Sequence, residues 1–72
     1  MVIYELWDGR SNNLIATFGS ESEALHVVAR AIAEQGEGVV EPLELLWDDE
    51  ERDEYGVVAV GQALIERAKS AA

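Results

Sequence analysis

The 72-residue chain contains no cysteine, one histidine and one proline. Without thiols it can form neither disulfides nor thiolate metal sites, and one imidazole excludes a histidine-rich metal centre within one chain. No stretch reaches the roughly 18–20 apolar residues that a membrane-spanning helix needs. Met1 leads directly into an apolar segment without the basic residues of a signal peptide. We therefore expect a cytoplasmic protein.

Basic residues are also scarce. Five Lys and Arg stand against fifteen Asp and Glu, which gives a formal net charge of −10. The five are scattered, whereas a protein that follows a phosphate backbone needs clustered Lys and Arg. Direct binding of nucleic acid or membrane is not expected, and the charge favours a basic protein as partner.

The chain is also short. A single domain of about this size buries only about 60% of the surface that its unfolded form exposes. Only a small share of the residues, 7%, is aromatic. Small domains without disulfides or metals often gain stability from a partner subunit. The composition therefore predicts a homodimer.

The clearest element is a helix predicted for residues 20–35. Ser20 is a suitable N-cap, and Glu23 follows three residues later, as in a capping box. Gly36 comes directly after the last helical residue, where a left-handed conformation is common. One face of this helix is apolar, and it carries Ala24, Leu25, Val28, Ala29 and Ile32.

Four segments rich in β-branched and aromatic residues are predicted as strands. They are residues 2–8, 14–18, 43–48 and 55–60. Strands joined by short polar turns form antiparallel hairpins, so these segments pair as two hairpins. In the second strand, Leu14, Ala16 and Phe18 are expected on one face.

A shorter helix is expected at about residues 62–70. Its inward-facing residues are predicted to be Ala63, Leu64, Ile65 and Ala68. The element order is then ββαββα, and we predict an α+β domain over residues 1–72 with a four-stranded, mainly antiparallel sheet and both helices on one face. Residues 36–42, with two glycines and the only proline, connect the two halves.

The halves 2–35 and 43–70 resemble each other. YELWD at 4–8 matches ELLWD at 44–48, and each is followed by a turn, a β-rich segment and a helix. Trp7 and Trp47 hold matching places in this comparison. The pattern indicates a ββα internal repeat.

The first strand is apolar on both faces. Val2, Tyr4 and Leu6 alternate with Ile3, Glu5 and Trp7. Two helices cover only one face of a sheet, so the other face is expected to dock a second chain. Trp7 and Trp47 are then either interface residues or ordinary core residues.

An acidic run follows the third strand. It contains Asp48, Asp49, Glu50, Glu51, Asp53 and Glu54. The spacing does not match an EF-hand loop, which needs a glycine at its sixth position. The run is therefore a solvated hairpin tip, a contact for a basic partner, or a weak divalent-metal site. Together with Trp7 and Trp47, these six acids are the candidate partner-binding residues.

His26 lies at the edge of the apolar helix stripe. Catalysis would require a nucleophile or acid within hydrogen-bond reach, and the sequence contains no such motif. A surface histidine is the simpler interpretation. We expect no enzymatic activity and no cofactor.

The opening pattern, YELWD at 4–8, NLIATF at 13–18 and EAL at 23–25, is similar to that of small bacterial proteins with a ββα start. It also resembles the front of HicB-like antitoxins, a resemblance that implies an acidic dimer binding a basic ribonuclease toxin. The proline- and glycine-rich segment of that family is missing between the second strand and the helix. A DNA-binding tail is also missing, unless residues 61–72 serve as one.

The sequence therefore predicts a non-enzymatic protein-interaction module. We expect a homodimer that presents an acidic surface to a basic partner, as an antitoxin or an inhibitor that mimics nucleic acid would. The alternative is a small-molecule or divalent-metal-binding domain.

Overall fold

The computed structural model describes residues 1–71. Within this range, four strands and two α-helices follow one another in the order ββαββα, as predicted. The strands are β1 (Val2–Asp8), β2 (Asn13–Phe18), β3 (Leu43–Asp49) and β4 (Glu54–Val60). The helices are α1 (Glu21–Gln35) and α2 (Gln62–Ala71), and the short 3-10 helix η1 (Glu37–Val39) follows α1.

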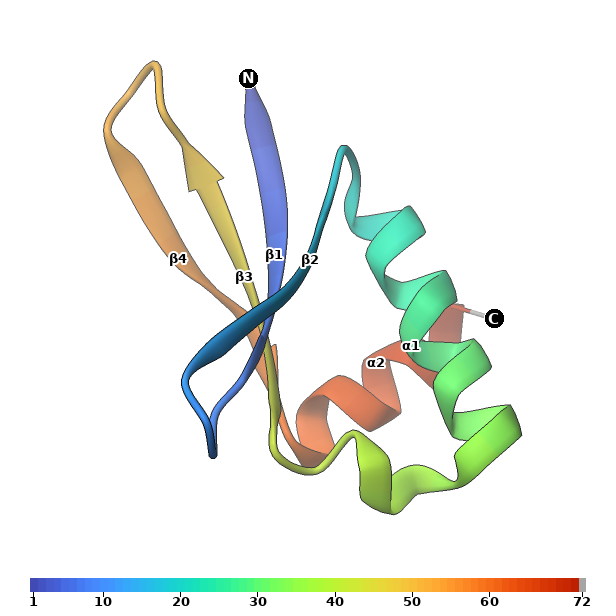
Figure 1. Ribbon diagram of the computed structural model, residues 1–72. Helices are drawn as coiled ribbons and strands as arrows, with labels where there is room; N and C mark the ends of the chain where they lie inside the picture. The colour runs from blue at the N-terminus through green and yellow to red at the C-terminus, as the bar shows by residue number, and fades with distance from the viewer. Residues whose placement is uncertain (72) are drawn as a thin grey trace.

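The strands form one antiparallel sheet in the order β2-β1-β3-β4. Each hairpin supplies one central strand and one edge strand. Both helices lie on the same side of the sheet, as predicted, and the β3–β4 hairpin extends beyond them (Figure 1). One face of the sheet is thus covered by α1 and α2, and we call the opposite face the outer face.

The ends of α1 are fixed by the residues that the sequence indicated. The backbone N–H of Glu23 donates to Ser20 Oγ at 3.2 Å. At the other end Gly36 has φ 90°, in the region that favours glycine, and its N–H donates to the carbonyl of Ile32 at 2.8 Å. The boundaries of α1 are therefore encoded locally.

The core lies between the sheet and the two helices. Leu6 and Leu45 supply its floor from the central strands, and α1 contributes the predicted stripe. From α2, Leu64, Ile65 and Ala68 are buried, whereas Ala63 is exposed, so its predicted inward position is wrong. Each helical residue advances by about 100°, which turns Ala63 away from the face centred between Leu64 and Ala68.

A pseudo-two-fold axis relates the halves of the chain. It passes beside Leu6 and Leu45, which lie directly opposite each other in the β1–β3 ladder. Each edge strand carries one extra residue at the equivalent place, Ile15 in β2 and Val58 in β4, which makes a β-bulge. The internal repeat is thus present in the pairing itself.

The repeat has an offset of 39 residues in the central strands. Leu6 then corresponds to Leu45, just as Leu25 of α1 corresponds to Leu64 of α2. The matching of Trp7 with Trp47, 40 residues apart, is wrong by one residue. Since side chains alternate between faces, that one residue places the two indoles on opposite faces of the sheet.

The bulge at Ile15 also changes the facing of β2. Leu14 pairs with Trp7 on the outer face, while Ala16 pairs with Leu6 on the helix side. The prediction that Leu14 shares a face with Ala16 and Phe18 is therefore wrong. Alternation holds only while every residue has a partner on the next strand, and the bulged residue has none.

Candidate partner-binding surface

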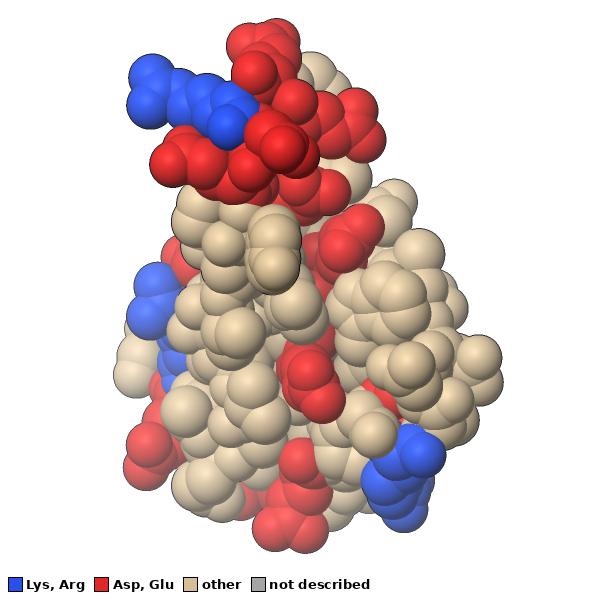
Figure 2. Space-filling model, turned by 90° about the vertical axis from the view of Figure 1, so that its left-hand side faces the viewer, with Lys and Arg blue, Asp and Glu red and all other residues tan. Residues whose placement is uncertain are grey.

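The outer face of the sheet is open to solvent in the described part of the chain (Figure 2). The strand register assigns its side chains from all four strands. They are Ile3, Glu5, Trp7, Leu14, Thr17, Glu44, Leu46, Asp48, Tyr55, Val57 and Val60. This set combines large apolar groups with carboxylates.

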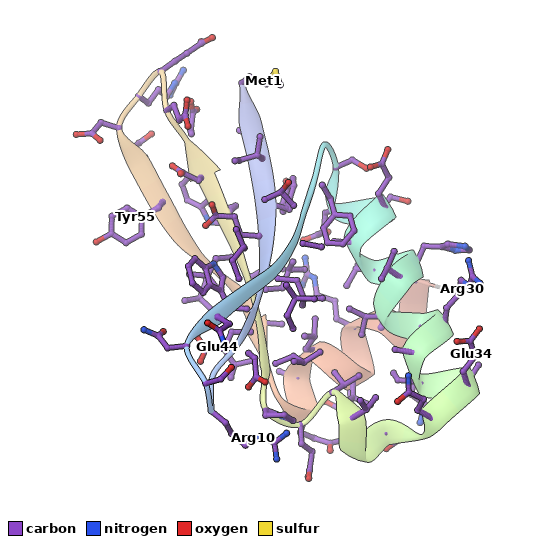
Figure 3. All side chains as sticks on the ribbon, viewed as in Figure 1. Met1, Arg10, Arg30, Glu34, Glu44 and Tyr55 are labelled. Carbon is purple, nitrogen blue, oxygen red and sulfur yellow. The ribbon has the colours of Figure 1, made fainter. Side chains whose placement is uncertain are left out.

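The apolar groups of the outer face are strongly exposed along β4. Tyr55 is 80% exposed and Val57 is 61% exposed, and Leu14 on the opposite edge strand is 46% exposed. Figure 3 shows Tyr55 projecting from β4 away from the helices. Contiguous apolar side chains of this kind commonly mark a site of protein–protein contact.

The charge on the outer face has one sign. Glu5, Glu44 and Asp48 are half-buried among the apolar groups, and the four strands that the structure describes contain no Lys, Arg or His. Figure 2 shows acidic side chains gathered at one end of this face and continuing between apolar side chains toward the other end. A partner that covers the face must neutralise these carboxylates.

A hollow of about 220 Å³ lies at the other end of the outer face. Its walls are Trp7, Gly9, Asn12, Glu44 and Leu46. The β1–β2 turn is tied to the start of β3, because the Gly9 N–H donates to the carbonyl of Pro42 at 2.8 Å. A side chain at position 9 would collide with the Glu44 carboxylate, so the glycine makes room for it.

Two local contacts order this end of the sheet. The indole N–H of Trp7 donates to Glu5 Oε1 at 3.3 Å, which holds the ring along the strand. In the turn, the backbone N–H of Arg10 donates to Asp8 Oδ1 at 2.9 Å. That hydrogen bond lowers the pKa of Asp8, because it favours the charged form of the carboxyl group. The hollow therefore has one aromatic wall and one carboxylate, on a pinned turn.

The acidic tip of the β3–β4 hairpin is shaped by its own side chains. Asp49 Oδ1 accepts the backbone N–H groups of Glu51 at 3.1 Å and Arg52 at 3.4 Å. Asp53 has φ 53°, a left-handed conformation that aspartate tolerates. The Met1 ammonium lies 3.2 Å from a carboxylate oxygen of Glu51 and 3.7 Å from one of Asp49. Asp49 thus has a structural contact and is not a free ligand.

The sequence-predicted site residues fall into three groups. Trp7 and Asp48 lie on the outer face. Trp47 lies on the helix side of the sheet with its indole over Gly56, and Asp49 and Glu54 pair with each other at the end of the ladder. The remaining acids, which are Glu50, Glu51 and Asp53, occupy the exposed tip. The six acids and two tryptophans therefore do not form one surface.

Glu5, Glu44, Tyr55 and Val57 are outer-face residues that sequence reasoning did not select. The alternation of β1 had already set Glu5 beside Trp7, which was the available signal. The side of β4 that faces outward depends on the bulge at Val58, and the sequence does not encode that bulge visibly.

Other chemical sites find less support. His26 is exposed on α1. Over residues 1–71, no group of three or more His, Asp or Glu side chains is placed to hold a metal ion. No helix in the same range is long and apolar enough to cross a membrane.

Comparisons with known proteins gave no match to the chain among family models, curated proteins or solved structures.

Proposed function

We propose that this chain is a non-enzymatic protein-interaction module whose outer face binds a basic segment of another protein. The observation that carries the proposal is the combination of exposed apolar groups and half-buried carboxylates on a face without a basic residue. An amphipathic helix with Lys or Arg between its apolar residues fits this combination. Its apolar side chains would cover Leu46 and Val57, and its cations would meet Glu5 and Glu44.

The hollow beside Trp7 gives this partner an anchor point. A Lys or Arg side chain entering it would bring its charge to Glu44 and its aliphatic stem to Leu46 and the indole. A cation near the face of a tryptophan gains about 0.5–2 kcal/mol, more as water is excluded. We expect one basic side chain of the partner to contribute more than the others.

The test uses a synthetic helical peptide with lysines and leucines spaced to form one basic, apolar face. Binding is followed by the emission of Trp7 in a Trp47→Phe background, where Trp7 is the remaining tryptophan. Replacing Glu44 by Gln removes the charge in the hollow, and we expect affinity to fall about fivefold to tenfold, as for a partly desolvated ion pair.

The matched control is Glu66→Gln, which makes the same charge change at an exposed position of α2. It leaves affinity nearly unchanged if the outer face is the site. Equal losses from both substitutions would mean that the peptide responds only to net charge, and the proposal would then be wrong. Added salt should weaken binding, since it screens attraction between opposite charges.

The acidic tip extends the same surface. Glu50, Glu51 and Asp53 are exposed beyond the end of the outer face and can attract a basic partner from a distance. An antitoxin or an inhibitor that mimics a phosphate backbone would use both parts, the tip for attraction and the face for contact. Neutralising the tip should slow association more than it speeds dissociation.

A small-molecule or divalent-metal-binding domain is the alternative that the sequence leaves open. The hollow beside Trp7 is its one structural argument, because a compact organic cation fits the same walls. A panel of amines tested for a rise in melting temperature separates the two functions, since a ligand of the folded state must stabilise it.

A further inference from the structure

The edge strand β4 offers unpaired backbone along its outer side. In the order β2-β1-β3-β4 it has one neighbour, β3. Natural edge strands are usually protected by lysine, proline, a short length or a bulge. Tyr55–Val60 contains no charged residue and no proline, and its single protective feature is the bulge at Val58.

We infer that β4 pairs with β4 of a second copy of this chain, antiparallel and about a two-fold axis beside Val57. Val57 is the middle residue of β4. The product is a continuous eight-stranded sheet with the helices of both copies on one side. The inference gives the homodimer an interface and is independent of whether a basic partner binds the outer face.

The distribution of charge favours this edge contact over a contact between two outer faces. Face-to-face docking would press Glu5, Glu44 and Asp48 against their own copies without a base to pair with. Burying unpaired carboxylates is costly. An antiparallel β4 contact sends the two acidic tips to opposite ends of the dimer, where their repulsion is smallest.

The ends of the paired strands are also complementary. In this arrangement Glu54 of one copy lies near the end of β4 in the other, where α2 begins. The first turn of α2 contains no acidic residue of its own, although carboxylates stabilise a helix N-terminus. The partner's Glu54 supplies that charge.

The other edge strand, β2, fits a second copy less well. It has six residues against seven in β4, and its exposed residues are less open: Leu14 is 46% exposed, whereas Val57, its equivalent, is 61% exposed. Pairing of β2 with β4 of the next copy would not close and would build fibres. Leu14 therefore provides a control position for Val57.

The chain contains no cysteine, so single cysteines report on the contact directly. Across the proposed axis, Val57→Cys faces its own copy within the roughly 4.5–5.5 Å that separates paired Cα atoms, close enough for a disulfide. Under mild oxidation we expect Val57→Cys to become a covalent dimer and Leu14→Cys to stay monomeric. Cross-linking of Leu14→Cys in preference to Val57→Cys would overturn the inference.

Mass in solution provides the second measurement. Light scattering over a concentration series should show the 7.9 kDa chain approaching twice that mass. Val57→Lys should remain monomeric, while Leu14→Lys should still dimerise. A wild-type monomer at every concentration overturns the inference, as does a dimer that Val57→Lys leaves intact.

Salt separates this contact from binding of a basic partner. Two chains of net charge −10 repel each other, so raising the ionic strength from about 0.01 M to about 0.15 M should favour the dimer as the screening length falls from about 30 Å to about 8 Å. The same change weakens binding of the basic peptide. Failure of one trend therefore does not imply failure of the other.

Discussion

Replacing Gly56 by alanine tests the packing that takes Trp47 out of the outer face. A Cβ at position 56 would lie 2.6 Å from Trp47 Nε1 and 2.9 Å from Trp47 Cε2. Carbon atoms do not approach so closely, and the contact involves the rigid ring rather than the end of a flexible chain. The indole must therefore move off the strand or push β3 and β4 apart.

The expected cost follows from two opposing effects. Overpacking of this kind costs about 1–3 kcal/mol, while losing a glycine stabilises the folded state by about 0.4–1 kcal/mol because the unfolded chain becomes less free. We expect Gly56→Ala to lower the free energy of unfolding by about 0.5–2.5 kcal/mol. The whole domain has about 4–11 kcal/mol, so the loss is easily measured.

The assay is urea unfolding followed by far-ultraviolet circular dichroism, in the wild type and in a Trp47→Leu background. Without the indole, Gly56→Ala should be neutral or stabilising, so the two substitutions should couple by about 1–3 kcal/mol. Gly19→Ala is the matched control, because a Cβ at Gly19 meets nothing within 4 Å. If Gly56→Ala costs the same in both backgrounds, Trp47 does not lie over Gly56 and our assignment of the two tryptophans to opposite faces fails.

Three further predictions concern stability. Leu45→Ala should lower the free energy of unfolding by about 2–5 kcal/mol, as expected for a fully buried leucine, whereas exposed Val57→Ala should change it by less than about 0.5 kcal/mol; urea midpoints compare them. Because the pKa of Asp8 is lowered in the folded state, its carboxylate stabilises the fold above the ordinary aspartate pKa, and the difference between wild type and Asp8→Asn should shrink as pH falls below about 3.9 in acid-unfolding series. Lys69 donates to Glu37 Oε2 at 2.8 Å, which raises the pKa of Lys69, so any stability lost in Lys69→Gln should be present at neutral pH and vanish as pH rises above about 10.4, measured by thermal melts.

The sequence predicted the elements of this fold well because their signals are local. The cap at Ser20, the glycine at position 36 and the spacing of Leu25 and Val28 lie within a few residues of the boundaries or faces that they determine. The ββαββα order and the covered face follow from these elements and from the apolar alternation of β1. No longer-range information was required for that part.

The surface was predicted less well because it depends on pairing between distant residues. The bulges at Ile15 and Val58 each shift an edge strand by one residue, and that shift decides whether Leu14 and Val57 face solvent or the core. The equal spacing of the two Trp-Asp pairs suggested equivalence, but the ladder aligns Leu6 with Leu45 and separates Trp7 from Trp47. A periodic pattern cannot report a register that is set across strands.

The axis beside Leu6 and Leu45 means that the chain is organised like a dimer of two linked hairpin–helix units. Residues 1–36 hold a complete unit with its own cap, central strand and edge strand. Cleavage in the connector around η1 would leave two fragments that expose β1 and β3 to each other, with Leu6 and Leu45 as the matching centre. Mixed as separate peptides, they have the means to reassemble, and two copies of the less acidic first fragment can build the same ladder from one sequence.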